Sequence, residues 1–240
     1  MWRYLAILGL LCLTAPALSR QDTQAGTVEA FLDRAVPRAA APGLAYALLE
    51  NGDVQLGERG ERVAGSGLPV TGDTPFALGS ISKSFTALAI LQQVEAGRIE
   101  LDHGIGAYLD AFDGQPGAAI TIRQLLSHTS GYSTLQGNQS HADGAGETDG
   151  LAGRVRQLAT IAPAGEPGSQ WQYSNANYLI LGGLIETVSG LEYGDYIETR
   201  ILEPLGMDDS FVADGEVHEA MAIGHTPWFG GRRPVADRRT

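Results

Sequence analysis

The 240-residue sequence contains one cysteine and one lysine, and it is short of positive charge. Its only thiol, Cys12, lies in an apolar stretch at the start of the chain, so we expect neither disulfides nor cysteine chemistry in the folded protein. The 16 basic side chains face 28 acidic ones, which gives a formal net charge of −12. Such a chain repels phosphate backbones unless it has a basic stripe, and none precedes the last ten residues. The composition therefore argues against a nucleic-acid partner.

Two kinds of catalytic pattern are also missing. The five histidines lack the paired spacing that is typical of a metal site, so we expect no metal and no cofactor. A G-x-S-x-G motif is absent, which argues against a Ser-His-Asp hydrolase.

With 43% hydrophobic and 18% charged residues, the composition is that of a globular protein. The length is sufficient for a real core, in one large domain or two joined ones.

Residues 1–19 have the composition of a secretory signal peptide. A single positive charge at Arg3 precedes an apolar run over residues 4–13, and small residues follow up to a cleavage site after Ser19. A membrane anchor is the alternative, but the apolar run is too short to span a bilayer comfortably. We expect an exported protein, periplasmic or extracellular, whose folded domain occupies residues 20–240.

The front of this domain predicts a helix and a hairpin. Residues 27–36 are expected to be helical, and residues 44–49 form an apolar run suited to a buried strand. The pair Asn51-Gly52 is typical of a two-residue hairpin turn, after which residues 54–58 return alongside the first strand.

The remainder is predicted to be almost entirely helices and loops. A helix over residues 80–96 stops before Gly97, and its apolar side is expected to carry Phe85, Leu88, Leu91 and Val94. A capping box over residues 121–124 opens a short helix through Ser127. The polar, glycine-rich residues 133–150 predict a mobile loop. Further helices are expected over residues 151–161, 178–189 and 193–202.

A serine and a lysine at the start of the predicted helix 80–96 could form a nucleophilic pair. Ser80 and Lys83 are three residues apart, so both side chains share one helix face. A serine hydroxyl becomes a nucleophile when a neighbouring base takes its proton, although a serine at a helix start is often only a cap. Lys83 is the only lysine beside 15 arginines. A desolvated lysine can lose its proton and arginine cannot, which favours a chemical role over a leftover surface lysine.

A second group of polar residues is the triplet Tyr173-Ser174-Asn175. A phenol can move a proton if a nearby ammonium lowers its pKa, and an asparagine can bind both that amine and a substrate amide. By itself such a triplet is most often a turn. Its significance depends on the motifs that accompany it.

Four linked blocks resemble one enzyme family. They are FALGSISK at residues 76–83, IRQLLSHTSG at 122–131, WQYSN at 171–175 and PLGM at 204–207. Their order and spacing resemble the β-lactamase-related serine hydrolases, a family that includes class C β-lactamases, penicillin-binding DD-peptidases, D-aminopeptidases and β-lactamase-like esterases. The resemblance covers roughly residues 31–211. It implies an α+β fold in which an antiparallel sheet flanked by helices carries an all-helical insert at about residues 100–211.

The resemblance also implies roles for individual residues. Ser80 would be the acylated nucleophile, Lys83 its proton partner, Tyr173 the general base and acid, and Asn175 a substrate and lysine contact. We interpret His128 as a structural histidine that satisfies loop carbonyls, because this chemistry leaves it no proton to move.

One family block is missing from the sequence. The family has Lys or His, then Ser or Thr, then Gly on a strand that lines the site and supplies an oxyanion donor. His225-Thr226-Pro227 is faintly similar, but Pro227 lacks an N–H and the triplet follows Tyr173 too closely. We therefore expect that the C-terminal sheet strands are missing and that the chain is truncated. On this reasoning we expect the 240 residues alone to be inactive and poorly soluble, and an extension that restores a sheet strand with the third block to be active.

The leading hypothesis is a secreted serine hydrolase that forms an acyl-enzyme on Ser80 with an ester, peptide or β-lactam. Its partner would be a small-molecule or peptide substrate. The alternative is a catalytically silent binding or scaffold protein of the same fold, or an inactive gene fragment, because the third block is absent. The two hypotheses differ in whether a fluorescent penicillin or a fluorophosphonate labels Ser80.

Overall fold

The computed structural model describes residues 20–36, 41–142, 150–213, 220–228 and 231–234. The predicted signal peptide and Cys12 lie outside these residues. The chain divides into two compact units, the first formed by Met1–Thr74 with Ala220–Asp237 and the second chiefly by Pro75–Glu219. None of the described helices has the length and hydrophobicity needed to cross a membrane.

The first unit contains the predicted hairpin. Strand β1 (Gly43–Glu50) pairs antiparallel with β2 (Asp53–Gly60), and Ala47 lies opposite Leu56. Asn51 and Gly52 have φ angles of 54° and 93°, the left-handed conformation that such a turn requires, so the turn prediction is confirmed.

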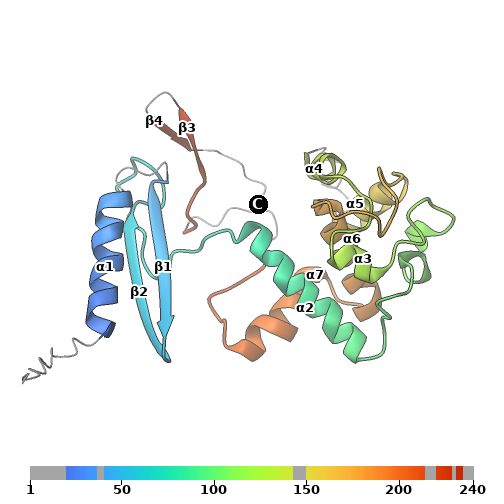
Figure 1. Ribbon diagram of the computed structural model, residues 1–240, viewed down its shortest axis with the longest axis horizontal. Coiled ribbons are helices and arrows are strands. Elements are labelled where there is room, and N and C mark those ends of the chain that lie inside the picture. The colour runs from blue at the N-terminus through green and yellow to red at the C-terminus, as the bar shows by residue number, and fades with distance from the viewer. Residues whose placement is uncertain (1–19, 37–40, 143–149, 214–219, 229–230, 235–240) are drawn as a thin grey trace, which may run out of the picture. The chain divides into compact units, whose positions relative to one another are not determined.

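One helix packs on this hairpin. Helix α1 (Arg20–Ala35) begins earlier than the sequence indicated, and Figure 1 shows it lying along the two strands. Its Glu29 accepts hydrogen bonds from Tyr46 and Arg59, and its Asp33 accepts one from Arg59 at 2.9 Å. These polar contacts fix α1 against one face of the hairpin.

A second hairpin lies near the end of the chain, where the sequence analysis predicted helices and loops. Strand β3 (His225–Trp228) pairs antiparallel with β4 (Gly231–Pro234), and within the described residues these strands form a sheet separate from β1 and β2. The segment that leads into β3 is attached to the first unit, because the Ile223 N–H donates to the Arg62 carbonyl at 2.9 Å. Composition had concealed β3 because its four residues include a proline and no aliphatic side chain.

The second unit is helical. Its elements are η2 (Gly79–Ile81), α2 (Ser82–Glu95), η3 (Ile105–Ala107), η4 (Asp110–Phe112), α3 (Ile122–Leu126), α4 (Thr134–Ala142), α5 (Gly150–Ala159), α6 (Asn175–Ser189), α7 (Tyr193–Ile197), the π-helical turn η5 (Glu198–Leu202) and η6 (Glu203–Leu205). The predicted capping box is confirmed, because the Thr121 hydroxyl accepts from the Gln124 N–H while the Gln124 side chain accepts from the Thr121 N–H. Gly190 ends α6 at a φ of 73°, as expected.

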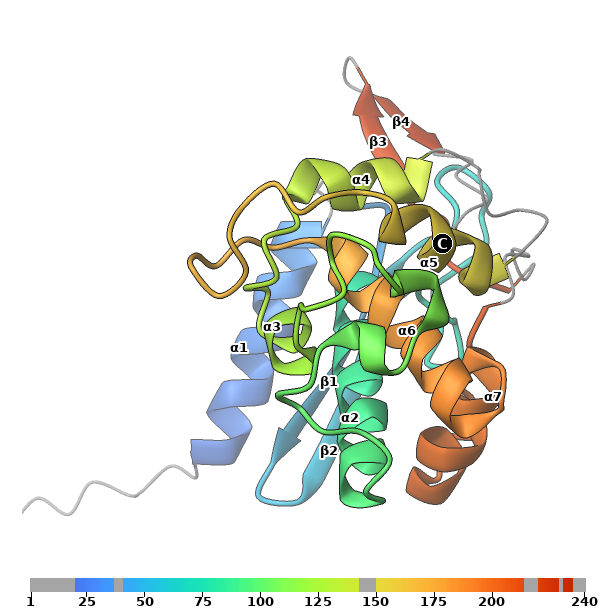
Figure 2. The ribbon, with the colours of Figure 1, turned by 90° about the vertical axis from the view of Figure 1, so that its right-hand side faces the viewer.

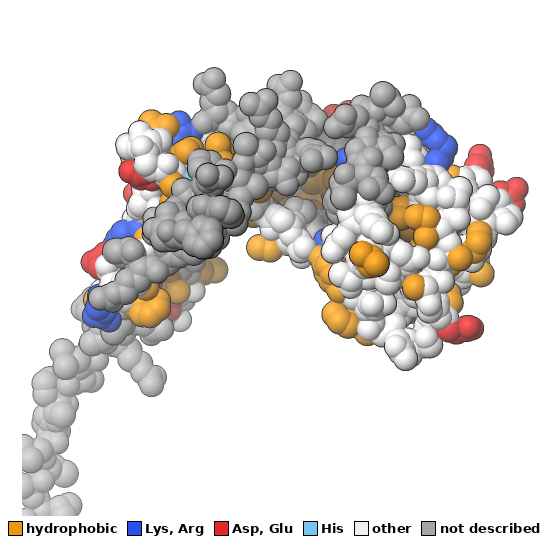
Figure 3. Space-filling view, turned by 90° about the horizontal axis from the view of Figure 1, so that it is seen from above, with side chains coloured by type: hydrophobic (Ala, Val, Ile, Leu, Met, Phe, Trp, Pro, Cys, Tyr) orange, Lys and Arg blue, Asp and Glu red, His pale blue; other side chains and the backbone are white. Residues whose placement is uncertain are grey.

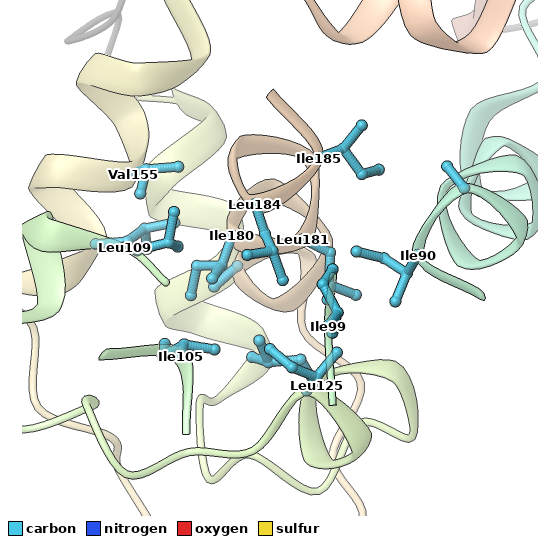
Figure 4. Packing of buried hydrophobic residues seen from close by; sticks show 14 of the residues in the cluster. Ile90, Ile99, Ile105, Leu109, Leu125, Val155, Ile180, Leu181, Leu184 and Ile185 are labelled. Carbon is cyan, nitrogen blue, oxygen red and sulfur yellow. The ribbon is translucent and has the colours of Figure 1, made fainter. Parts of the chain in front are cut away.

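Helix α6 is the centre of this unit. It contacts α2, α3, α4, α5 and α7, and Figure 2 shows it surrounded by them. Apolar residues lie on most sides of α6, as is typical of a helix that is buried in a core. The close-up in Figure 4 shows its side chains among those of neighbouring elements, with the labelled residues Ile90, Ile99, Ile105, Leu109, Leu125, Val155, Ile180, Leu181, Leu184 and Ile185.

The sequence predicted half of the buried face of α2, because Phe85 and Val94 pack against the core. Leu88 and Leu91, however, are 42% and 48% exposed, whereas Thr86 and Gln93 are buried. Their polar groups are satisfied by α7, because Thr86 Oγ1 lies 2.7 Å from the Tyr193 hydroxyl and Gln93 donates to Tyr196 at 2.6 Å. Residues 134–142 form α4 instead of the predicted loop, and residues 143–149 lie outside the described part of the chain.

On the face seen in Figure 3, basic side chains are few and scattered between hydrophobic and uncharged groups. A continuous basic stripe is not visible on the described part of that face. The described atoms in this view are chiefly hydrophobic or uncharged, with acidic groups at a few places.

Candidate active site

Ser80 and Lys83 lie at the entrance to α2. Ser80 is the middle residue of the 3₁₀ turn η2, whose first residue, Gly79, has a φ of 53°, and Lys83 lies in the first turn of α2. The N-caps of η2 and α2 are Leu78 and Ile81, neither with a side-chain cap hydrogen bond. The Ser80 hydroxyl therefore does not cap either helix, which excludes the interpretation that this serine is only a helix cap.

The Ser80 hydroxyl lies between a phenol and an ammonium. Its Oγ is 2.6 Å from the Tyr173 hydroxyl, and Lys83 Nζ donates to it at 3.3 Å. These groups come from segments that are 93 residues apart in the sequence. The structure thus brings together the three residues that the sequence predicted as nucleophile, proton partner and general base.

Asn175 completes this cluster. Lys83 Nζ donates to Asn175 Oδ1 at 2.9 Å, and it lies 5.0 Å from the centre of the Tyr173 ring. The predicted contact between the asparagine and the lysine is therefore present. The only lysine of the chain lies in this cluster of hydroxyl, phenol and amide groups.

The electrostatics of the cluster favour a phenol that gives up its proton. Burial raises the pKa of Tyr173, but hydrogen bonds with Lys83 and Ser80 and the positive charge of Lys83 lower it, and the result is a pKa below the usual value. The phenolate that forms when Tyr173 loses its proton can accept the proton of the Ser80 hydroxyl, which lies 2.6 Å away.

Helix α4 contributes contacts that the sequence analysis missed. Asn138 Oδ1 accepts from Asn175 Nδ2 at 3.4 Å, which leaves Asn175 Oδ1 directed at Lys83, and Thr134 Oγ1 donates to the Tyr173 carbonyl at 2.6 Å. The sequence does contain a local signal for the start of α4. Ser133 and Gln136 form a reciprocal capping pair, with their N–H groups donating to each other's side chains at 2.8 and 3.2 Å.

His128 lies against Tyr173 with hydrogen bonds different from those expected. Its Nδ1 accepts the Ser174 N–H at 3.2 Å and faces Asn177 Nδ2 at 3.0 Å, so the ring nitrogen meets donors and not loop carbonyls. The sequence identified the residue but not its partners, because they lie in the segment around Tyr173.

The faint third-block triplet lies in β3 of the first unit. There His225 Nε2 accepts the Ala64 N–H at 3.0 Å, so this ring nitrogen serves contacts within its own unit. Within the described residues, no group of three or more His, Cys, Asp or Glu side chains could hold a metal ion.

The sequence profile of the Beta-lactamase family matches residues 26–239, most of the chain. The chain belongs to this family. Its curated relatives include penicillin-binding protein 4 of Amycolatopsis lactamdurans, which is 33% identical over 73% of this chain and 46% of the relative, and esterase EstB of Burkholderia gladioli, which is 33% identical over 77% and 50%.

Solved structures agree with this assignment. The octameric penicillin-binding protein homologue from Pyrococcus abyssi has a TM-score of 0.76 and 31% identity, over 88% of this chain and 50% of that one. The expected α+β fold of the family is confirmed. The chain spans half the length or less of these curated relatives.

Proposed function

We propose that the protein is an exported serine hydrolase that forms an acyl-enzyme on Ser80 with an ester or amide substrate. The observation that carries this proposal is the 2.6 Å contact between the Ser80 and Tyr173 hydroxyls, with the Lys83 ammonium bound to Ser80 and Asn175. Relatives named as a penicillin-binding protein and as an esterase favour peptide, β-lactam or ester substrates. Export rests on the composition of residues 1–19 alone.

In the proposed acylation, the Tyr173 phenolate takes the proton of the Ser80 hydroxyl as Ser80 Oγ bonds to the substrate carbonyl carbon. Collapse of the tetrahedral intermediate breaks the bond to the leaving group, which receives that proton from the Tyr173 hydroxyl. The positive charge of Lys83 stabilises the phenolate before the proton moves. Lys83 is held toward the pair by Asn175, whose own amide is oriented by Asn138.

Deacylation reverses these proton movements with water. Tyr173 takes a proton from water while the hydroxide oxygen bonds to the acyl carbon, and collapse then breaks the bond to Ser80 Oγ. The proton on Tyr173 returns to Ser80, which restores the starting state. One phenol therefore acts as base and acid in both halves of the reaction.

Covalent labelling tests this proposal. The intact protein is incubated with a fluorescent penicillin and, separately, with a fluorophosphonate, and the adduct is located by intact mass and peptide mapping. We expect one adduct, at Ser80, that is abolished by Ser80→Ala and retained by the matched control Ser84→Ala, which changes an exposed serine of α2. The absence of an adduct with both reagents would instead support a catalytically silent binding protein.

A further inference from the structure

His128 holds the backbone on both sides of Tyr173. Its carbonyl accepts the Gln172 N–H at 2.8 Å, and its Nδ1 accepts the Ser174 N–H at 3.2 Å. Between these two bonds the imidazole stacks on the Tyr173 ring, with centroids 4.6 Å apart and planes tilted by 33°. One residue thus fixes the chain before Tyr173, the ring itself and the chain after it.

The hydrogen-bond network fixes which nitrogen of His128 carries the proton. Ser130 Oγ donates to Asn177 Oδ1 at 2.6 Å, so the Asn177 amide nitrogen is the group that faces His128 Nδ1 at 3.0 Å. Ser130 and Asn177 are buried, which prevents water from replacing these bonds freely. Two N–H donors therefore converge on Nδ1, and this nitrogen must be unprotonated, with the proton of the neutral ring on Nε2.

Protonation of the ring would break this arrangement. A proton on Nδ1 would point at the Ser174 and Asn177 N–H groups, so both hydrogen bonds would be lost. The titratable groups that face the imidazole are the Tyr173 and Tyr178 phenols, at 4.6 and 5.3 Å between ring centroids, and the Lys83 ammonium. Burial, and then the charge of Lys83, lowers the pKa of His128, which agrees with a neutral ring. The bonds to Nδ1 are therefore kept above the ordinary histidine pKa and lost as the pH falls through the lowered one.

We propose that His128 is the positioning residue of Tyr173, and that the site acylates only while the His128 imidazole is neutral. This inference rests on the proposed function, in which Tyr173 takes the proton of Ser80. It assigns no proton transfer to His128. The residue acts through the backbone and ring of Tyr173, so loss of its bonds would displace the Tyr173 hydroxyl from its 2.6 Å contact with Ser80.

Two substitutions separate the acceptor of His128 from its titration. Asparagine tolerates the left-handed φ of 57° at this position, and its Oδ1 can accept the same hydrogen bonds without ever being protonated. Alanine offers no acceptor. His103, whose ring contacts Glu100 and Tyr108 and none of the residues of the cluster described above, provides the matched control His103→Asn.

The experiment measures the rate of fluorophosphonate labelling between about pH 4.5 and 8, with thermal melting at each pH to confirm folding. We expect His128→Asn to keep most of the neutral-pH rate and to move the acid limb of the profile to lower pH. His128→Ala should lose about tenfold to a hundredfold at neutral pH, since a displacement near 1 Å can cost that much. His103→Asn should follow the wild type. Identical profiles for His128→Asn, His128→Ala and wild type would overturn the positioning role.

A second readout is independent of activity. In protein labelled with nitrogen-15 histidine, the His128 resonances should show an unprotonated Nδ1 and a protonated Nε2 at neutral pH. Observation of the opposite tautomer, or of a cationic ring, would refute the inference even if no labelling occurred. Failure of the wild type to label at any pH, together with the expected tautomer, would count against the proposed hydrolase and not against the position of His128.

Discussion

Helix α4 packs closely against the start of α6 at Gly137, and replacement of this glycine by alanine tests whether the contact sets the geometry of the site. A Cβ added there would lie 2.6 Å from the Asn175 backbone nitrogen and 2.6 Å from Ser174 Oγ. Ordinary contact begins at 3.4 Å, so one of the two helices must move by about 0.8 Å. The neighbour is backbone, which cannot rotate away as a flexible side chain would.

This displacement has a defined effect on the cluster. Asn175 moved by about 0.8 Å would stretch its 2.9 Å hydrogen bond from Lys83 beyond the range of a real bond. We expect the acylation rate of Gly137→Ala to fall on the order of tenfold to a hundredfold. Stability should change less, because overpacking costs about 1–3 kcal/mol and removal of a helical glycine returns about 1 kcal/mol.

The assay compares fluorophosphonate labelling rates and melting temperatures with those of Gly182→Ala. Gly182 lies inside α6, and the nearest atom to its added Cβ is Leu151 Cδ2 at 3.0 Å, the end of a flexible side chain. This control gains the same helix propensity without forcing backbone to move, so its labelling rate should stay normal. A normal rate for Gly137→Ala would refute the reasoning, because α4 would then accommodate the methyl group without disturbing Asn175.

Two further substitutions test the chemical roles. Lys83→Arg keeps the positive charge, but the planar guanidinium cannot take the place of the single Nζ that donates to both Ser80 Oγ and Asn175 Oδ1. Labelling should therefore be abolished while the melting temperature is retained, and near-normal labelling would remove the specific role of the amine. Tyr173→Phe keeps the ring that stacks on His128 and removes only the hydroxyl, so turnover of a p-nitrophenyl ester should fall at least about a hundredfold. An unchanged rate would show that Tyr173 contributes only packing.

Features with local causes could be predicted from the sequence. The Asn51-Gly52 turn and the end of α6 at Gly190 both depend on residues that adopt a positive φ cheaply. The start of α3 at Thr121 depends on hydrogen bonds within four residues. Helix α4 has an equally local signal in Ser133 and Gln136, but the overall polarity of the segment concealed it.

Features that depend on distant partners could not be predicted from periodicity. Thr86 and Gln93 are buried on α2 because tyrosine hydroxyls on α7 satisfy them, and a pattern of apolar residues contains no information about those partners. The site shows the same limit. Ser80 and Tyr173 are far apart in sequence, and their proximity was predicted from the resemblance to a family. The contacts of His128 and Asn138, which no such resemblance supplied, required the structure.

The position of the single lysine has a practical consequence for handling the protein. Reagents that modify amines usually spread over a surface rich in lysine, but in this chain the lysine side chain they can reach is Lys83, which is half-buried among Ser80, Tyr173 and Asn175. Amine coupling to a sensor chip, or labelling with an amine-reactive dye, would either attach at the N-terminus or modify the cluster itself. Carbamylation by cyanate in aged urea solutions would act on the same nitrogen. Because all the other basic residues of the chain except histidine are arginines, ordinary amine-directed bioconjugation tests the site.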